Sequence, residues 1–309
     1  MAELIYSEFR DPKQMLADQE YDGHLSLHDD KMAEDLGFAG APIEGPTHFS
    51  QFVPMLHEMF GDRWFEQGCI SAHYKNMVVE GERVRVFAEP LAEGSTLTRI
   101  GAEKSDGTPV LTGTASVGPD HGKTEISQRI EMLRPSKQLV ILSDLKVGQK
   151  GAGNPESAIM GTDQHMGKLY PFSVNDKLKV ITELHPYYYA DQSPWENAVI
   201  PLEMVSILTQ YTGGRSGFRS RGPAVGMFAG LEIKIIDGPL LVDHAYKLER
   251  EIVALSESRR TESSWVRTSV YDGESDKLVA EVILNSATLK ASYAKYDEDA
   301  AALGKVIEG

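Results

Sequence analysis

The sequence predicts an α+β protein made of two similar halves, each with a long helix followed by an antiparallel sheet. Two observations carry this prediction. A helix-periodic apolar segment precedes short alternating segments and glycine turns up to about residue 120, and the same order recurs after residue 191. Residues 68–84 and 226–242 also match in pattern, as an internal structural repeat would.

In the first half, residues 47–60 are expected to form the helix, because apolar side chains recur there at helical spacing. These side chains are Phe49, Phe52, Val53, Leu56 and Phe60. A meander follows, in which Val84, Val86 and Ala88 alternate by twos as in a half-buried strand. The expected strand segments are 69–79, 82–91, 95–105 and 109–118, with turns at 80–81 and 106–107.

In the second half, residues 199–211 form the expected helix, closed by Gly213 and Gly214. Four strand segments follow, with turns at 237–238 and 272–273. A long helix wrapped by a curved antiparallel sheet is a hot-dog fold, so the chain is expected to be a double hot-dog. An isolated unit leaves sheet edges and one face uncovered, which favours pairing of two units. Two unrelated α+β domains are the alternative.

The expected domain organisation has three parts. Residues 1–125 form the N-terminal hot-dog half, residues 126–190 a linker with extra elements that leads into the second half, and residues 191–309 the C-terminal half. Within the linker, residues 138–148 resemble an additional strand, and a glycine-rich stretch follows them.

Composition narrows the class of protein. Hydrophobic residues make up 41% and charged residues 25%, as in a packed globular protein. The formal net charge of −15 disfavours binding to nucleic acid. The single cysteine, Cys69, cannot form an internal disulfide, which fits a reducing compartment, although a cysteine-poor secreted protein would have the same composition. The chain begins without an apolar core of signal-peptide length, and no stretch approaches the roughly 18 apolar residues that cross a bilayer. A cytoplasmic protein without a membrane span is expected.

Residues 28–52, HDDKMAEDLGFAGAPIEGPTHFSQF, resemble the core motif of MaoC-like dehydratases and (R)-specific enoyl-CoA hydratases. In that family a short helix ends in Ala-x-x-x-Gly-Phe, and a Pro-Ile-Ala-His-Gly-like segment opens the hot-dog helix. The matching residues here are Ala33, Gly37, Phe38, Pro42, Ile43 and Gly45. The resemblance implies hydration or dehydration of an enoyl or 3-hydroxyacyl thioester, or of a related small acid, without a cofactor.

The family activates water with an Asp and a His in the pattern Asp-x-x-x-x-His. Here Asp22 stands at the aspartate position, the histidine position falls on Leu27, and His28 is the next residue. His24 is also near, but a surface position suits it better. A histidine can exchange a proton in either direction near neutral pH, so Asp22 and His28 are candidate catalytic residues. A polar turn with a helix cap is the alternative reading.

A second cluster begins the expected hot-dog helix. Glu44 replaces the family's histidine before the helix glycine, Gly45, and His48 follows. Free N–H groups at a helix start favour an anionic oxygen such as that of a polarised thioester. Glu44 and His48 are therefore candidate catalytic residues and Gly45 a candidate substrate contact, with helix capping by Glu44 or Thr47 as the alternative. A carboxylate at this place is also common in hot-dog thioesterases.

The second half adds further candidates. Glu203 lies in an otherwise apolar helix, where a carboxylate is either buried and functional or turned to solvent. Arg215, Arg219 and Arg221 form a basic, glycine-rich stretch that could bind the phosphates of CoA, with ordinary surface arginines as the alternative. The tyrosines at 187–189 either line an acyl pocket or pack in the core.

The expected function is that of a MaoC-like hydro-lyase acting on a small molecule, such as an acyl-CoA thioester. An acyl thioesterase, a non-catalytic hot-dog that binds an acyl ligand, and chemistry on a substrate that is not a thioester are the alternatives. The nine histidines form no pair at metal-ligand spacing, so no metal is expected. A homo-oligomer is expected.

Overall fold

Ten strands in the described part of the chain form one antiparallel sheet in this computed structural model, which describes residues 3–20, 34, 40–134, 136 and 138–305. The first half contributes β1 (Ile5–Tyr6), β2 (Gly68–Tyr74), β3 (Val84–Ala88), β4 (Leu97–Lys104) and β5 (Pro109–Val117). The remaining strands are β6 (Glu156–Ile159), β7 (Gly226–Ile235), β8 (Ala245–Glu257), β9 (Thr261–Asp272) and β10 (Leu278–Leu289).

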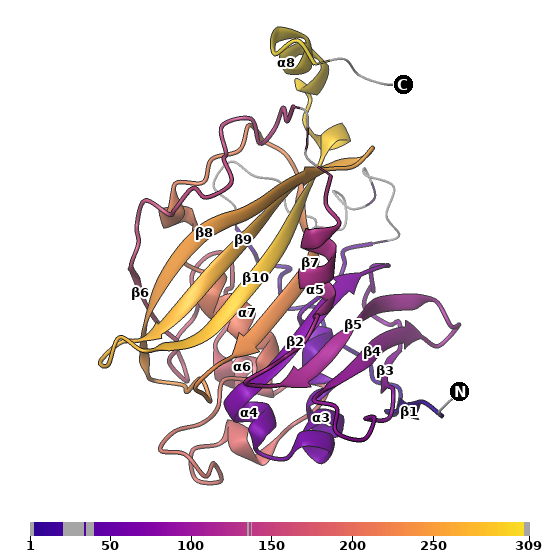
Figure 1. Cartoon of the computed structure of the whole chain (residues 1–309), viewed down its shortest axis with the longest axis vertical. Coiled ribbons are helices and arrows are strands. Elements are labelled where there is room, and N and C mark those ends of the chain that lie inside the picture. The colour runs from indigo at the N-terminus through magenta and orange to yellow at the C-terminus, as the bar shows by residue number, and fades with distance from the viewer. Residues whose placement is uncertain (1–2, 21–33, 35–39, 135, 137, 306–309) are drawn as a thin grey trace.

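The strand order is β1-β3-β4-β5-β2-β7-β10-β9-β8-β6. In each half the first strand after the helix lies at the centre, as β2 or β7, and the last strand of that half pairs with it, as β5 or β10. β2 and β7 pair antiparallel in the middle, with Cys69 opposite Lys234 and His73 opposite Gly230. Gly68 and Gly226, the first residues of the two matching sequence segments, begin these two strands. The repeat that the sequence predicts is therefore a pseudo-two-fold arrangement of two helix-and-meander units in one continuous sheet (Figure 1).

The helices of the two halves meet on one face of this sheet. They are α2 (Thr47–Ser50), α3 (Val53–Phe60) and α4 (Arg63–Gln67) in the first half and α7 (Leu202–Gln210) in the second. α2 packs against α7. Phe49 and Leu56 from one half and Met204 and Leu208 from the other belong to one buried cluster, so the two units share a hydrophobic core.

Both helices depart from their predicted bounds at a proline. The helix predicted at 47–60 is divided between α2 and α3, because Pro54 has no N–H to donate to the Ser50 carbonyl. The helix predicted at 199–211 begins only at Leu202, because Pro201 is extended at ψ 138°. Val199 instead forms a bridge to Leu241.

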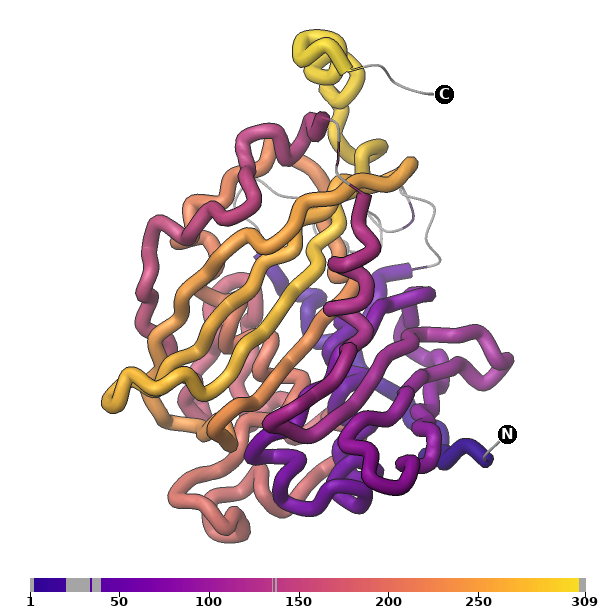
Figure 2. Tube along the Cα trace, in the orientation of Figure 1, coloured from indigo at the N-terminus to yellow at the C-terminus, as the bar shows by residue number. Residues whose placement is uncertain are grey.

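The segment between the halves carries α5 (Glu125–Glu131), α6 (Val174–Leu178) and the short helix η1 (Pro186–Tyr188). α5 lies across β2 and β7 on the face away from α7, where Ile126 N donates to Ser71 Oγ (Figure 1). The chain then follows the edge of the second half to β6, which pairs with β8 (Figure 2). The proposed domain boundaries at 125 and 190 remain a prediction, with β6 inside the segment assigned to the linker.

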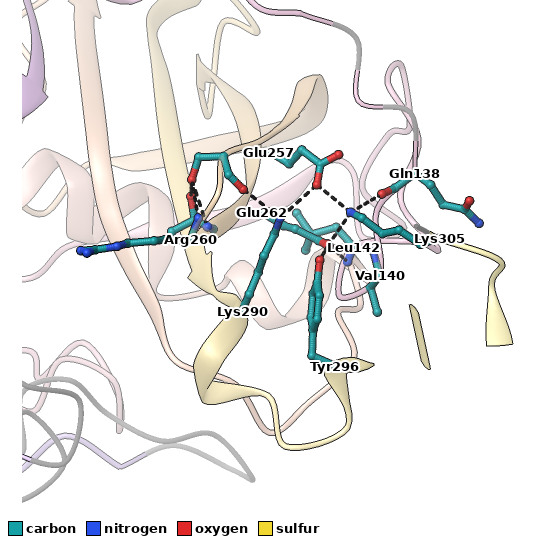
Figure 3. Close-up of polar contacts among 11 residues, drawn as sticks. Gln138, Val140, Leu142, Glu257, Arg260, Glu262, Lys290, Tyr296 and Lys305 are labelled. Atoms are coloured by element: carbon teal, nitrogen blue, oxygen red, sulfur yellow. Dashed lines mark hydrogen bonds and ion pairs between the residues drawn. The ribbon is translucent and has the colours of Figure 1, made fainter. Parts of the chain in front are cut away.

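The strand predicted at 138–148 is wrong: this segment forms turns. Its backbone donors are satisfied by a carboxylate instead of a strand ladder. Val140 N and Leu142 N donate to the fully buried carboxylate of Glu262, at 2.9 and 3.0 Å (Figure 3). Tyr296, the first residue of α8 (Tyr296–Ala302), donates its hydroxyl to the same carboxylate at 3.1 Å. Glu262 therefore ties the linker and the C-terminal helix to β9.

None of the helices in the described part of the chain has the length and apolar character that crossing a membrane requires.

Candidate active site

A pocket of about 410 Å³ opens where the two halves meet. The loop before α2 and the end of β2 form one wall, with Glu44, Gly45, His48 and Tyr74 among its residues. The second half forms the other wall through the start of β7 and the end of β10, including Met227, Phe228, Ser286 and Thr288. The pocket thus combines ionisable side chains from the first half with apolar and hydroxyl side chains from the second.

Backbone geometry places Glu44 and Gly45 at the pocket wall. Ile43 N donates to Val78 O at 2.8 Å, so the segment before α2 pairs with the residues that follow β2. Thr47 N and His48 N then donate back to the carbonyls of Glu44 and Gly45, so the turn leads into α2. The Gly45 N–H has no acceptor in the described part of the chain. Gly45, which lines the pocket, therefore has, directly before α2, a backbone N–H without an acceptor among the described residues.

The carboxyl of Glu44 is 10% exposed and lies at the pocket. Burial raises the pKa of Glu44 to about 7, since a low-dielectric environment disfavours the anion. The nearby Lys177 ammonium opposes this rise, and the Glu203 carboxylate adds to it. A carboxyl with this pKa can both accept and donate a proton near neutral pH.

Lys177 and Glu203 lie behind Glu44. Lys177 Nζ is 3.8 Å from Glu44 Oε2 and 3.6 Å from Glu203 Oε2, and both Lys177 and Glu203 are only 2% exposed. Burial raises the pKa of Glu203, and Lys177 opposes this rise. Glu203 is not among the residues that line the pocket, so its carboxylate contacts Lys177 and not the pocket space.

Lys177 was not predicted from the sequence. Its helix, α6, begins with a capping box, in which Ser173 Oγ accepts from Asp176 N and the Asp176 carboxylate accepts from Ser173 N. That signal identifies the helix. It does not reveal that the next residue, a lysine in a short polar helix, turns inward.

His48 and Tyr74 add neutral polar groups to the pocket. Burial lowers the pKa of His48 to about 4, so its imidazole is neutral at pH 7. Burial also raises the pKa of the Tyr74 hydroxyl well above its usual range, and the Glu44 carboxylate adds to this rise. His48 Nδ1 and the Tyr74 hydroxyl are buried without a hydrogen-bond partner in the described part of the chain. Both are therefore available to a bound ligand or water.

The three arginines of the basic stretch do not line the pocket, although the neighbouring Ser220 does. Arg221 pairs with Asp299 at 2.9 Å and donates to Ser143 Oγ at 3.1 Å, away from the pocket. Arg215 and Arg219 are exposed.

Other predicted residues lie elsewhere. Tyr187 donates its hydroxyl to Asp62 at 2.9 Å, and none of the tyrosines at 187–189 lines the pocket. Asp22, His24 and His28 lie outside the described residues, as do Ala33, Gly37 and Phe38 of the segment 28–52 that carries the family resemblance. Among the residues that the structure describes, no three His, Cys, Asp or Glu side chains gather as a metal site.

No family model matches this chain, and neither does any curated protein. Solved structures do. A protein of Chloroflexus aurantiacus J-10-fl assigned to the MaoC domain dehydratases is similar with a TM-score of 0.58 at 10% sequence identity, over 94% of this chain and 95% of that one. A conserved double hot-dog protein of Mycobacterium tuberculosis gives 0.59 at 9% identity, over 93% and 96%. These likenesses confirm the predicted double hot-dog fold and the structural resemblance to MaoC-domain proteins.

Proposed function

We propose that this chain is a MaoC-like hydro-lyase that adds water to an enoyl thioester or removes it from a 3-hydroxyacyl thioester. One observation carries the proposal. The Glu44 carboxyl, which titrates near neutral pH, shares a pocket wall with the free N–H of Gly45. An acid–base group and an oxyanion donor are the two devices that this reaction needs.

The proposed chemistry uses both devices at once. The thioester carbonyl oxygen accepts a hydrogen bond from Gly45 N–H, which stabilises the negative charge that builds up on that oxygen as water attacks C3. The Glu44 carboxylate takes a proton from the attacking water, whose oxygen bonds to C3, and the same carboxyl then delivers a proton to C2. One water is added across the double bond, and Glu44 returns to its starting state.

The neutral groups in the pocket fit this scheme. His48 and Tyr74 have buried polar atoms without partners, and these can hold the water or the substrate oxygen. Asp22 and His28 remain proposed contributors to proton transfer. The fold likeness to a protein assigned to the MaoC domain dehydratases supports this reaction class.

Thioester hydrolysis is the competing reaction, because the same carboxylate could direct water to the carbonyl carbon. The two reactions differ in their products. Purified protein mixed with crotonyl-CoA at pH 7 should lose the enoyl absorbance without releasing free thiol. Thiol release without prior hydration would replace the hydro-lyase with a thioesterase, and no turnover across a series of acyl chain lengths would leave only an acyl-binding role.

A carboxylate variant with a matched control assigns the role of Glu44. Glu44→Gln should lower kcat/KM for hydration by about 10²-fold or more, as expected for loss of a general acid–base group. Glu183 is similarly buried, at 15% exposure, and pairs with Arg10 away from the pocket. Glu183→Gln should therefore leave the rate within about twofold of the unaltered protein, a spread that corresponds to a few tenths of a kcal/mol.

The remaining expectations are kept as proposals. Arg215 and Arg219, both exposed and close in sequence to the pocket residue Ser220, are proposed contacts for the phosphates of an acyl-CoA. A cytoplasmic location and a homo-oligomeric state are likewise proposed.

A further inference from the structure

Three charged side chains from three separate segments converge behind the pocket wall. Glu44 comes from the loop before α2, Lys177 from α6 and Glu203 from α7. The Lys177 ammonium lies between the two carboxylates, 3.8 Å from Glu44 Oε2 and 3.6 Å from Glu203 Oε2. Only Glu44 of the three lines the pocket.

We propose that Lys177 and Glu203 are positioning residues that set the charge and orientation of the Glu44 carboxyl through their shared ion pair. This inference rests on the proposed function, because it concerns the same carboxyl. The inference adds two residues outside the pocket lining that act on this carboxyl.

Charge balance supports the proposal. Two carboxylates and one ammonium would leave one uncompensated negative charge at a site where Lys177 and Glu203 are 2% exposed. A buried, unbalanced charge is costly, so the group is most stable when it holds one additional proton. The two carboxyls then titrate as a coupled unit, in which the charge of one depends on that of the other.

Lys177 is committed to this pair of carboxylates. Within the described part of the chain, its ion pairs are those with Glu44 and Glu203. Its ammonium also lies 5.0 Å from the centre of the Phe172 ring, a favourable cation–π distance. The ammonium is thus held in place from two sides and can in turn hold Glu44 at the pocket wall.

The hydroxyls of Thr47 and Ser50 also lie beside the Glu203 carboxylate and oppose the rise in its pKa. Neither Glu203 oxygen reaches good hydrogen-bond geometry with them. The ammonium of Lys177 is therefore the principal stabilising partner of ionised Glu203.

The other titratable groups that face this unit stay neutral at pH 7. Tyr74 on β2 faces Glu44, Tyr188 in η1 faces Glu203, and burial raises the pKa of both phenols. His48 on α2 is neutral because burial lowers its pKa to about 4. Beside the larger effect of burial, Lys177 and Glu203 are therefore the charged groups that act on the Glu44 carboxyl near neutral pH.

The titration of Glu44 tests the proposal without substrate. Carboxyl ¹³C NMR of the full chain would follow Glu44, whose signal is identified by its absence in Glu44→Gln. Glu203→Gln removes a like charge and should lower the apparent pKa of Glu44 by about one unit or more. Lys177→Met removes the compensating cation and should raise it by a similar amount. Lys177→Arg should stay near the unaltered value.

Two further variants keep this test decisive. Lys104 is also partly buried and pairs with Glu82, so Lys104→Met is the matched control and should leave Glu44 unchanged. If Lys177→Met does not fold, the double variant Lys177→Met/Glu203→Gln removes the cation together with the Glu203 anion, so no unpaired Glu203 carboxylate is left buried. The pKa of Glu44 in the double variant should lie above that in Glu203→Gln alone, because Glu203→Gln keeps the Lys177 cation.

Shifts of the same sign in the two single variants, or shifts no larger than that of Lys104→Met, would overturn the proposal. Because this readout needs no turnover, it separates failure of the positioning role from failure of the hydro-lyase assignment. If both proposals hold, the pH profile of kcat for hydration should move in the same directions as the Glu44 titration.

Discussion

Gly45 lies directly against the ring of Tyr74: a Cβ on Gly45 would come within 2.6 Å of Tyr74 Cζ. The close approach, and not an unusual backbone angle, requires glycine here. The Tyr74 ring also stacks on Phe49 from α2, with 6.3 Å between ring centres. The start of α2 and the end of β2 therefore fit together only without a side chain at position 45, and this fit shapes the pocket wall.

Gly45→Ala should displace Tyr74 and deform the pocket. Such overpacking costs about 1–3 kcal/mol of unfolding free energy, which urea unfolding would measure. Binding of a thioester substrate should weaken in parallel. Gly214 has open space around its α-carbon and no positive φ, so Gly214→Ala is the control and should alter neither property. Equal behaviour of the two variants would show that the contact with Tyr74 does not shape the site.

The element order of this fold could be predicted from the sequence, because each half has its own helical and alternating periodicity. The bounds of the helices and strands were harder to predict. Pro54 leaves most of the apolar pattern of residues 47–60 intact, so the interruption after α2 depends on one missing N–H. Residues 138–148 are as apolar as a strand, but their donors bind Glu262, which lies more than a hundred residues away in sequence.

The candidate site shows the same division between local and distant signals. Glu44, Gly45 and His48 could be selected because they open a helix in a recognisable motif, and the structure places them together at one pocket. Glu203 stood out as a carboxylate in an apolar helix, and it is buried. Lys177 could not be selected, since its burial arises from packing between distant segments and not from any pattern around it.

Protonation of His48 should contribute a loss of stability as the pH drops below about 6.5. Burial lowers the pKa of His48 to about 4 in the folded protein, whereas the unfolded chain binds a proton near pH 6.5. Between these values the unfolded state binds more protons, so lowering the pH favours unfolding. The shift corresponds to about 3 kcal/mol in all. Glu44 acts in the opposite sense, since its raised pKa of about 7 favours the folded state as the pH falls from 7 towards 4.5.

Urea unfolding at several pH values would isolate the part due to His48. In His48→Gln, the loss of unfolding free energy between pH 6.5 and 4.5 should be smaller by about 2 kcal/mol than in the unaltered protein. His165 is exposed, with 63% of its side chain accessible, so His165→Gln is the control and should retain the original pH dependence. If the unfolding free energy of His48→Gln has the same pH dependence as that of the unaltered protein, His48 does not bind fewer protons in the folded state than in the unfolded state.

The buried ion pair between Glu156 on β6 and Arg250 on β8 should stabilise the edge of the second half. Both side chains are 2% exposed, and Arg250 also donates to Thr209 O at the end of α7. Arg250→Met leaves the Glu156 carboxylate buried without its cation, which should cost about 3–5 kcal/mol. Adding Glu156→Gln should recover part of that loss in urea unfolding. A double variant less stable than Arg250→Met would contradict the assignment of the cost to an unpaired charge.

Glu262 should be the main attachment of residues 138–148 and α8 to the sheet. Glu262→Ala leaves the Val140 and Leu142 N–H groups buried without an acceptor, at about 1–3 kcal/mol each, so a total loss of about 3 kcal/mol or more is expected. Glu262→Gln keeps an acceptor oxygen and should cost less. The neighbouring Glu257 pairs with Lys290 and Lys305 and is more exposed, at 24% (Figure 3).

Hydrogen exchange separates this local role from a general loss of stability. Exchange is measured without denaturant, at a pH at which the β10 amides remain protected. In Glu262→Ala, the amides of Val140, Leu142 and α8 should then exchange faster than in the unaltered protein. Glu257→Ala removes only ion pairs at a partly exposed position, which are worth about 1 kcal/mol or less, and should leave the Val140 and Leu142 amides protected. Equal exchange in the two variants would show that the carboxylate of Glu262 is not what holds this segment, because of these two carboxylates Glu262 is the one that accepts hydrogen bonds from the backbone of Val140 and Leu142.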